Sequence, residues 1–327
     1  MSALLQVNDL KKHFLLRGGL GARAGLVHAV DGVSFHIDTG ETLALVGESG
    51  CGKSTVGRAI LRLFDITAGQ VILDGQRIDD LSAANLRPLR RRIQVVFQDP
   101  FSSLNPRMRV RDILAEPIRN FGLAKSPADM RARIDRLLDK VGLPRDSVSR
   151  WPHEFSGGQR QRIGIARALA ADPDLIVCDE AVSALDVSVK AQIINLLHDL
   201  QRELGLALLF ISHDLAVVEY MTHRVAVMYL GKIVELAPKR QIFMAPRHPY
   251  TKALLSAVPR PEPDAPRNRI VLKGDVPSPV NPPRGCRFHT RCPYVFDRCR
   301  VEEPELRLTE NNHFAACHLN DLPAAAQ

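Results

Sequence analysis

Hydrophobic residues follow strand spacing near the start of the chain and helical spacing soon after. Short alternating or apolar runs within residues 3–10 and 28–46, among them VSFHI and TLALVG, predict strands joined by turns. The stretch QVILDGQRI at 70–78 predicts a hairpin that turns at its Asp-Gly pair. Between these strands, apolar side chains three and four residues apart predict a helix over residues 53–63.

Farther along, helix and strand patterns alternate. Residues 107–150 carry apolar side chains at helical intervals, in segments that end near glycine. Beyond them the predicted helices are 159–171, 188–204 and 214–220, and the predicted strands are 174–178, 206–211 and 224–229. This alternation predicts an α/β fold with a largely parallel sheet covered by helices.

The composition changes after residue 258. Eight of the 25 residues from 259 to 283 are proline, which excludes a regular helix or a central strand there. We therefore predict one domain at 1–258, followed at 259–327 by a Pro-rich linker and a small C-terminal extension. A Gly-rich stretch, LLRGGLGARAGL at 15–26, predicts a loop within the first domain.

Composition narrows the class of protein without deciding its function. The hydrophobic share of 45% and the charged share of 24% are ordinary for a soluble globular chain. The sequence lacks both the run of about 18–20 apolar residues that a spanning helix needs and a signal-peptide pattern, so we expect a cytosolic protein with few structural disulfides. The net charge of +8 is modest, and RPLRRR at 87–92 has no interleaved aromatic residues, so we favour a solvated surface over a nucleic-acid site.

A phosphate-binding motif follows the predicted strand at 43–46. The stretch GESGCGKST matches G-x-x-x-x-G-K-[ST] and precedes a predicted helix, which is the context that this motif needs. Gly50 and Gly52 let the backbone N–H groups point inward, Lys53 reaches the β- and γ-phosphates, and the Ser54 hydroxyl ligates Mg²⁺. The expected ATP contacts are Gly47, Glu48, Ser49, Gly50, Cys51, Gly52, Lys53, Ser54 and Thr55.

Two adjacent carboxylates end a predicted strand in DLIVCDE. Asp179 is placed to hold Mg²⁺, directly or through water, and Glu180 to accept a proton from the attacking water. Adjacent carboxylates at a strand end are often only solvated, but a P-loop elsewhere in the chain favours the catalytic interpretation.

Four further motifs make the chain resemble the ABC-type ATPases. FSGGQRQR (155–162) resembles their signature sequence, VVFQDP (95–100) the Q-loop, SALD (183–186) the D-loop and ISHD (211–214) the H-loop, in the family's order. The resemblance implies a P-loop NTPase core of ABC type with an antiparallel β subdomain, an α-helical subdomain at about 107–150 and ATP hydrolysis as the activity.

The resemblance also implies roles for single residues. Gln98 would meet Mg²⁺ and the attacking water, His213 would contact the γ-phosphate, and Asp186 would lie at a dimer interface. In a head-to-tail dimer the signature residues Ser156, Gly157, Gly158 and Gln159 would close on ATP bound by the partner. Phe14 in LKKHF is the candidate for stacking on adenine, with a core phenylalanine as the alternative.

The last part of the chain narrows the resemblance. HPYTKALLSAVP (248–259) and VPSPVNPPRGCRFHTRCP (276–293) resemble the C-terminal extension of ATP-binding subunits in dipeptide and oligopeptide importers, and nickel importers use related subunits. The implied partners are a second ATPase subunit, identical or different, two membrane permeases and an extracytoplasmic substrate-binding protein. The implied location is peripheral, on the cytoplasmic side of the inner membrane.

A rival interpretation is a soluble ABC ATPase that acts on nucleic acid or ribosomes. Such proteins typically carry long coiled-coil insertions or two ATPase cores in one chain, and this sequence has neither.

Cysteines concentrate in the extension, where Cys286, Cys292, Cys299 and Cys317 are spaced C-x5-C-x6-C-x17-C. Structural zinc usually shows tighter pairs, although His289, His313 and His318 are possible ligands. Four thiolates on irregular backbone also suit a [4Fe–4S] cluster, and some of the resembling importers carry one here, so we favour it over zinc. Four free thiols in a small helical cap remain the simplest alternative.

Overall fold

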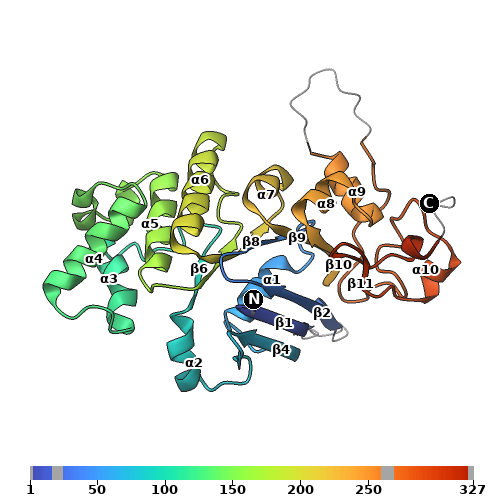
Figure 1. The fold of residues 1–327 in the computed structure, drawn as a ribbon, viewed down its shortest axis with the longest axis horizontal. Coiled ribbons are helices and arrows are strands. Elements are labelled where there is room, and N and C mark those ends of the chain that lie inside the picture. The colour runs from blue at the N-terminus through green and yellow to red at the C-terminus, as the bar shows by residue number, and fades with distance from the viewer. Residues whose placement is uncertain (1–2, 17–24, 259–268, 323–327) are drawn as a thin grey trace, which may run out of the picture. The chain divides into compact units, whose positions relative to one another are not determined.

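The computed structural model describes residues 3–16, 25–258 and 269–322 (Figure 1). Most of the predicted Gly-rich loop and the start of the Pro-rich linker lie outside the described residues. The chain forms two compact units. The first unit comprises Met1–Leu4, Ile37–Thr42 and Gln76–Ile211, and the second unit comprises Leu5–His36, Leu43–Gly75 and Ser212–Gln327.

The first unit is built on buried parallel strands. β6 (Ile93–Val96), β7 (Leu175–Asp179) and β8 (Ala207–Ser212) pair in the order β6-β7-β8. Every residue of β7 and β8 is buried, as expected of a parallel sheet that helices cover on both faces. Val96 lies opposite Cys178, so the carboxyl ends of β6 and β7 meet at one edge.

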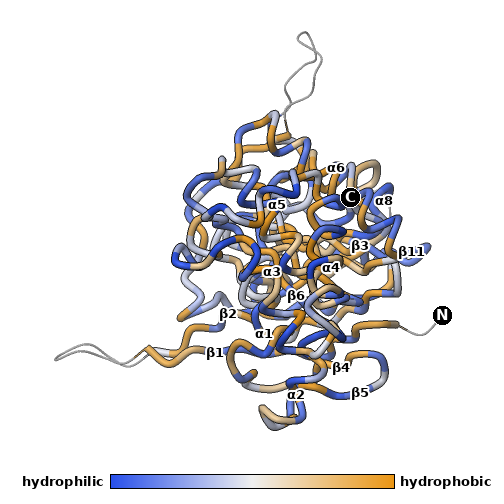
Figure 2. The backbone as a smooth tube through the Cα atoms, turned by 90° about the vertical axis from the view of Figure 1, so that its left-hand side faces the viewer, coloured by the Kyte–Doolittle hydropathy of each residue, from blue (hydrophilic) through white to orange (hydrophobic). Residues whose placement is uncertain are grey.

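Helices make up the rest of the first unit. They are α2 (Ala83–Arg90), α3 (Val110–Asn120), α4 (Pro127–Lys140), α5 (Gly157–Leu169) and α6 (Val187–Leu204), with 3-10 turns at Arg145–Ser149 and Pro152–Glu154. α3, α4 and α5 pack together (Figure 1), and hydrophilic and hydrophobic residues are interspersed along them (Figure 2). The structure thus contains the helices that the pattern at 107–150 predicts.

The second unit combines an antiparallel sheet with a mixed one. β1 (Leu5–Leu16) pairs antiparallel with β4 (Ala68–Leu73) and lies beside β2 (Gly25–Ile37). β3 (Thr42–Val46) is parallel to β9 (Arg224–Tyr229), which is antiparallel to β10 (Lys232–Pro238). The helices are α1 (Lys53–Ile60), α7 (Leu215–Met221), α8 (Lys239–Met244), α9 (Pro249–Ser256) and α10 (Asp297–Val301), with a 3-10 turn at His318–Asp321.

Local backbone geometry explains two details. Asp74 and Gly75, between β4 and β5 (Gln76–Arg77), have φ of 48° and 77°, the paired positive values that the predicted tight turn requires. The predicted helix at 53–63 ends earlier, at Ile60, and Arg62 takes a left-handed φ of 51° that stops its continuation.

The extension adds strands that the sequence pattern did not predict. β11 (Arg307–Glu310) pairs with β12 (His313–Ala315), and β12 pairs antiparallel with β10, with Ala315 opposite Glu235. These strands are three or four residues long, too short for alternation to be distinctive. The extension therefore continues the sheet that also contains β3 and β9. A domain boundary at residue 258 stays a prediction.

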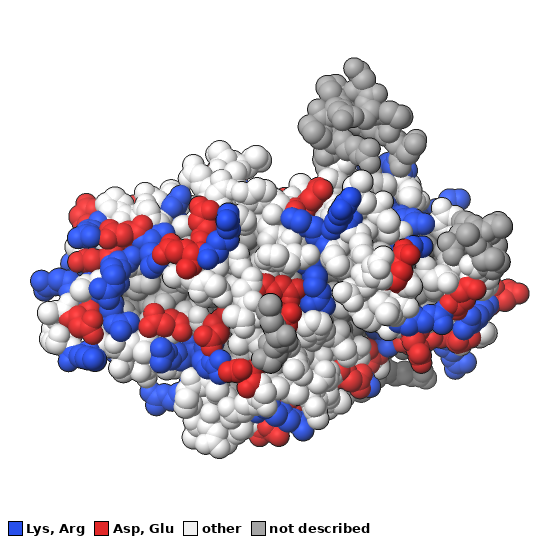
Figure 3. Space-filling view, in the orientation of Figure 1, with Lys and Arg blue, Asp and Glu red and all other residues white. Residues whose placement is uncertain are grey.

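Charges of both signs are mixed on the face shown in Figure 3, where Lys and Arg lie among Asp and Glu. Within the described part of the chain, none of the helices combines the length and apolar character that crossing a bilayer requires.

Candidate functional site

The predicted phosphate loop connects β3 to α1 and has glycine at its tightest points. A Cβ atom at Gly47 would lie 2.1 Å from the Met228 carbonyl oxygen, and Gly52 takes φ 108° at the start of the helix. Lys53, only 4% exposed, donates from Nζ to the carbonyl oxygens of Gly47 and Glu48 at 2.8 and 2.9 Å. A cation and a helix N-terminus meet in this loop, an arrangement that suits a phosphate.

Residues from the last third of the chain hold Glu48 of this loop. The Glu48 N–H donates to the Tyr250 hydroxyl at 2.8 Å. Arg291 donates from Nη1 to Oε2 of Glu48 at 2.7 Å and from Nη2 to Oε1 at 3.1 Å. Hydrogen bonding to Glu48 raises the pKa of Arg291. Sequence reasoning missed both partners, because nothing in the local sequence at Tyr250 or Arg291 points to residue 48.

Phe14 lies partly open to solvent at the end of β1. Its ring meets the Phe64 ring edge-on at 5.6 Å, and the Lys12 ammonium lies 4.8 Å from its centroid. The side chain is 38% exposed, which does not fit the core-phenylalanine alternative. An exposed ring face is what stacking on a base requires.

Beside Phe14, two imidazoles surround a carboxylate. His13 Nε2 lies 3.0 Å from Oδ1 of Asp31, and His28 Nδ1 lies 3.7 Å from Oδ2. Burial alone would raise the pKa of Asp31, but hydrogen bonds from His13 and Arg287 outweigh it and lower that pKa. Because Arg287 and Lys232 already neutralise this carboxylate, the trio is a poor metal site and instead links β1 and β2 to the extension.

In the first unit the structure joins two of the predicted catalytic residues. Gln98 donates from Nε2 to Oε2 of Glu180 at 3.1 Å, because the strands that precede them, β6 and β7, are neighbours. Asp179 ends β7 and is 4% exposed. Glu180 has a φ of 49°, a conformation that costs energy for a non-glycine residue and is held by its N–H bond to the Ile211 carbonyl.

The predicted signature residues begin α5. Ser156 is its N-cap, with Oγ accepting from the Gln159 N–H at 3.3 Å while Gln159 Oε1 accepts from the Ser156 N–H at 3.0 Å. A Cβ atom at Gly158 would lie 2.4 Å from a methyl group of Val189, so glycine allows α5 to approach the start of α6. Ser156, together with Asp186 at the start of α6, is exposed.

The predicted H-loop residue follows β8. His213 is exposed in the turn between β8 and α7. The next residue fixes this turn: Asp214 donates its N–H to the Ser212 hydroxyl at 3.0 Å, and its side chain accepts from the Val217 N–H at 3.4 Å.

The structure also brings the four cysteines of the extension together. All are free thiols; Cys299 is buried, and Cys286, Cys292 and Cys317 are half-buried. Burial, with the charges that the other three thiols carry when ionised, raises the pKa of Cys317 to about 12. The four sulfurs therefore lie within electrostatic range of one another, although up to 31 residues separate them.

The sulfurs are less tightly grouped than the ligands of a bound tetrahedral zinc ion. Tetrahedral zinc with Zn–S bonds of about 2.3 Å puts its sulfurs about 3.8 Å apart. Among the described residues, no three of these sulfurs lie within 4.8 Å of one another. Each histidine considered as a zinc ligand has a hydrogen bond through one ring nitrogen: His313 to Glu235 at 2.6 Å, His289 to the Cys286 carbonyl and His318 to the Glu302 carbonyl.

Known proteins resemble the chain over almost its whole length. The family model for the ABC transporter matches residues 30–183, and that for the oligopeptide/dipeptide transporter C-terminal region matches residues 234–299. The chain is 55% identical over 325 residues to the "Probable peptide ABC transporter ATP-binding protein y4tS" of Sinorhizobium fredii, covering 99% of this chain and 92% of that protein. It is 53% identical to the oligopeptide transport ATP-binding protein AppF of Bacillus subtilis, with 97% of each chain covered.

A solved structure agrees with the fold. The dimeric structure of the ATP-binding cassette MJ0796, bound to ADP and Pi, superposes with a TM-score of 0.64 at 28% identity, covering 72% of this chain and 99% of that one. The fold and the motifs define an ABC ATPase, which confirms the predicted fold class. More narrowly, the chain belongs to the family of ABC transporter ATP-binding proteins that carry the oligopeptide/dipeptide transporter C-terminal region.

Proposed function

We propose that this ABC ATPase powers the import of di- and oligopeptides. The observation that carries the proposal is the alignment, over nearly the full chain, with relatives at 53–55% identity that are named for peptide transport. The match at 234–299 lies outside the catalytic motifs, so it marks the kind of transporter rather than ATP hydrolysis alone. A related nickel or small-solute importer is the second candidate, because the ATPase does not contact the cargo.

We assign the chemistry as follows. The loop 47–55 and Lys53 would bind the phosphates, Ser54, Gln98 and Asp179 would hold Mg²⁺, and Phe14 would stack on adenine. Water attacks the γ-phosphorus and gives its proton to Glu180, the bond to the ADP oxygen breaks, and His213 contacts the γ-phosphate. The hydrogen bond between Gln98 and Glu180 supports the assignment, since it orients the base beside a group suited to positioning water.

We also propose that ATP binding closes two ATPase subunits head to tail. Ser156, Asp186 and the neighbouring Val187, which is 84% exposed, all lie on the surface and are accessible to a partner subunit. In the closed dimer Ser156, Gly157, Gly158 and Gln159 would complete the partner's ATP site, and Asp186 would lie at the interface. The partner is a second copy or a related subunit.

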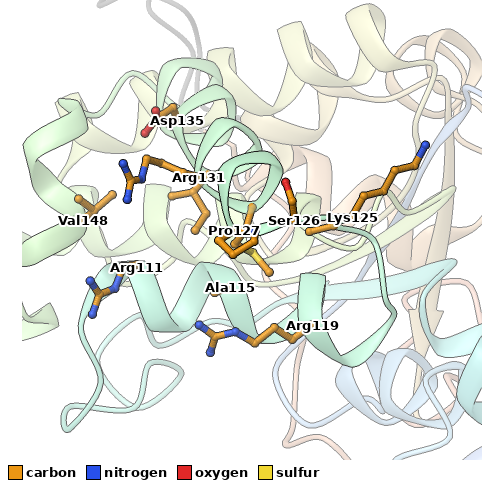
Figure 4. A pocket seen from close by; sticks show the side chains of 12 residues that line it. Arg111, Ala115, Arg119, Lys125, Ser126, Pro127, Arg131, Asp135 and Val148 are labelled. Carbon is orange, nitrogen blue, oxygen red and sulfur yellow. The ribbon is translucent and has the colours of Figure 1, made fainter.

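The membrane partners would dock on the helical segment of the first unit. A cavity of about 800 Å³ opens between α3 and α4 (Figure 4). Its lining carries one carboxylate, Asp135, and four cationic side chains, namely Arg111, Arg119, Lys125 and Arg131. An apolar floor with a basic rim fits a short amphipathic permease helix with acidic residues. The subunit would then sit at the cytoplasmic side of the inner membrane, with an extracytoplasmic binding protein delivering substrate to the permeases.

For the four thiols we propose a [4Fe–4S] cluster, in preference to zinc. The thiols lie within electrostatic range of one another, and among the described residues no three of their sulfurs lie within 4.8 Å, a looser arrangement than a tetrahedral zinc site. When bound, such a cluster would supply a structural cross-link to a segment with little core of its own.

Uptake by cells tests the transport proposal. Deletion of the gene should abolish uptake of labelled di- and tetrapeptides, and the wild-type gene, but not a Glu180→Gln copy, should restore it. Unchanged peptide uptake with lost nickel uptake would assign the subunit to the second candidate. Co-purification with ribosomes or DNA instead of permeases would overturn both.

A further inference from the structure

The loop between Cys286 and Cys292 is attached to the rest of the second unit at three points. Arg287 donates to the Leu230 carbonyl and pairs with Asp31. Phe288, 1% exposed, packs against Tyr229 and Tyr250 with ring centroids 5.2 and 5.4 Å apart. The third attachment is the pair between Arg291 and Glu48.

The third attachment reaches the phosphate loop itself. The Arg291 side chain is 9% exposed and the Glu48 side chain 29%, so the pair is partly shielded from water. Two parallel N–H···O bonds fix the direction of the carboxylate as well as its position. The Glu48 N–H is held by Tyr250 and its carbonyl accepts from Lys53, so Glu48 has a partner on every polar group.

From this contact we infer that Arg291 is a positioning residue for ATP binding, although it lies 243 residues from the loop it holds. It fixes the second residue of the P-loop and neutralises the carboxylate of that residue, which belongs to the loop proposed to bind the phosphates. The inference rests on the proposed binding of ATP by the loop 47–55.

Loss of Arg291 has two consequences. The loop gains freedom that must be lost again when ATP binds, and an uncompensated negative charge is left in the loop that is proposed to bind the triphosphate. Both consequences act on the bound ground state and the transition state alike, so they weaken ATP binding without slowing the chemical step. Removing a hydrogen-bonded charge of this kind predicts binding weaker by on the order of tenfold.

Equilibrium binding to the full-length protein tests the inference, with a fluorescent trinitrophenyl-ATP displaced by ATP. We expect Arg291→Ala to raise the dissociation constant for ATP about tenfold. Arg291→Lys keeps the charge but not the two parallel N–H donors, and should raise the constant less. In the double variant Arg291→Ala with Glu48→Gln, affinity should return toward wild type, because the uncompensated carboxylate is gone. Arg300→Ala, an exposed arginine of α10, is the matched control and should bind as wild type does.

The hydrolysis rate at saturating ATP separates positioning from damage. Arg291→Lys should keep kcat within about twofold while KM rises. Wild-type affinity in both Arg291 variants would overturn the inference, as would a lower kcat with unchanged KM, or a double variant no better than Arg291→Ala. Failure of the wild type to bind ATP would instead overturn the P-loop assignment.

Discussion

Gln98 and Glu180 are joined by a 3.1 Å hydrogen bond, although 82 residues separate them in sequence. The contact exists because β6 and β7 are parallel neighbours whose carboxyl ends coincide. The amide orients the Glu180 carboxylate at the end of a strand, directly after a buried aspartate, and this geometry supports the proposal that Glu180 takes a proton from water.

Replacing Glu180 by Gln should therefore stop hydrolysis while leaving ATP binding intact. We expect kcat to fall at least about a hundredfold, the usual contribution of a general base. Phosphate release measures the loss, and ATP titration measures the binding. Undiminished hydrolysis would refute the assigned base.

Ser156 caps the N-terminus of α5 and is proposed to complete the ATP site of a partner subunit, and Ser156→Ala separates these two roles. Loss of an N-cap should lower the free energy of unfolding by about 1 kcal/mol. Ser82→Ala removes an equivalent cap from α2 and should cost a similar amount. ATP-dependent dimerisation, followed by light scattering, should weaken in Ser156→Ala alone. Equal dimerisation by both variants would confine Ser156 to a capping role.

Charge reversal in the cavity between α3 and α4 tests membrane docking. Arg119→Glu combined with Arg131→Glu should lower recovery of the permeases in a pull-down from solubilised membranes by about tenfold, because repulsion replaces attraction. ATP hydrolysis by the isolated subunit should not change. Arg202→Glu, an exposed position on α6, is the control and should recover the permeases normally.

The buried His248 predicts a stability that depends on pH. Burial lowers the pKa of His248 to about 4, whereas the unfolded chain protonates it near pH 6.5. Below pH 6.5 the unfolded chain therefore takes up a proton that the folded chain does not bind. The free energy of unfolding is highest above pH 6.5 and falls as the pH drops toward 4. Between pH 7.5 and 5.0 the free energy of unfolding should fall by about 2 kcal/mol for this reason.

His248→Asn checks that assignment, because asparagine keeps an acceptor for the Tyr250 N–H but does not titrate. Urea unfolding at both pH values should show a smaller loss in this variant than in the wild type. An identical loss would place the acid sensitivity elsewhere.

Anaerobic purification tests the proposed cluster. The protein should be brown and contain about four iron atoms per chain. Cys317→Ser, which removes the ligand most distant in sequence, should lower the iron content, whereas Cys178→Ser, in buried β7, should not. A colourless protein with stoichiometric zinc would contradict the proposal.

The sequence alone predicted the parts of the site that are local. The P-loop, the signature helix and the strand ending at Asp179 are each written in consecutive residues, because glycine φ preferences, helix caps and continuous apolar runs act over a few positions. The same holds for the turn at Asp74 and Gly75. The four thiols were identified by type and spacing, but their convergence was not predictable from spacing.

Only the tertiary structure decided which distant side chains meet. The pairing of Arg291 with Glu48, the burial of His248 and the addition of β12 to β10 all depend on how strands far apart in sequence pair. No local periodicity encodes such contacts, because an ion pair is set by side-chain position in space. The sequence determined an ABC ATPase with a cysteine-bearing extension, and the tertiary structure placed that extension against the phosphate loop.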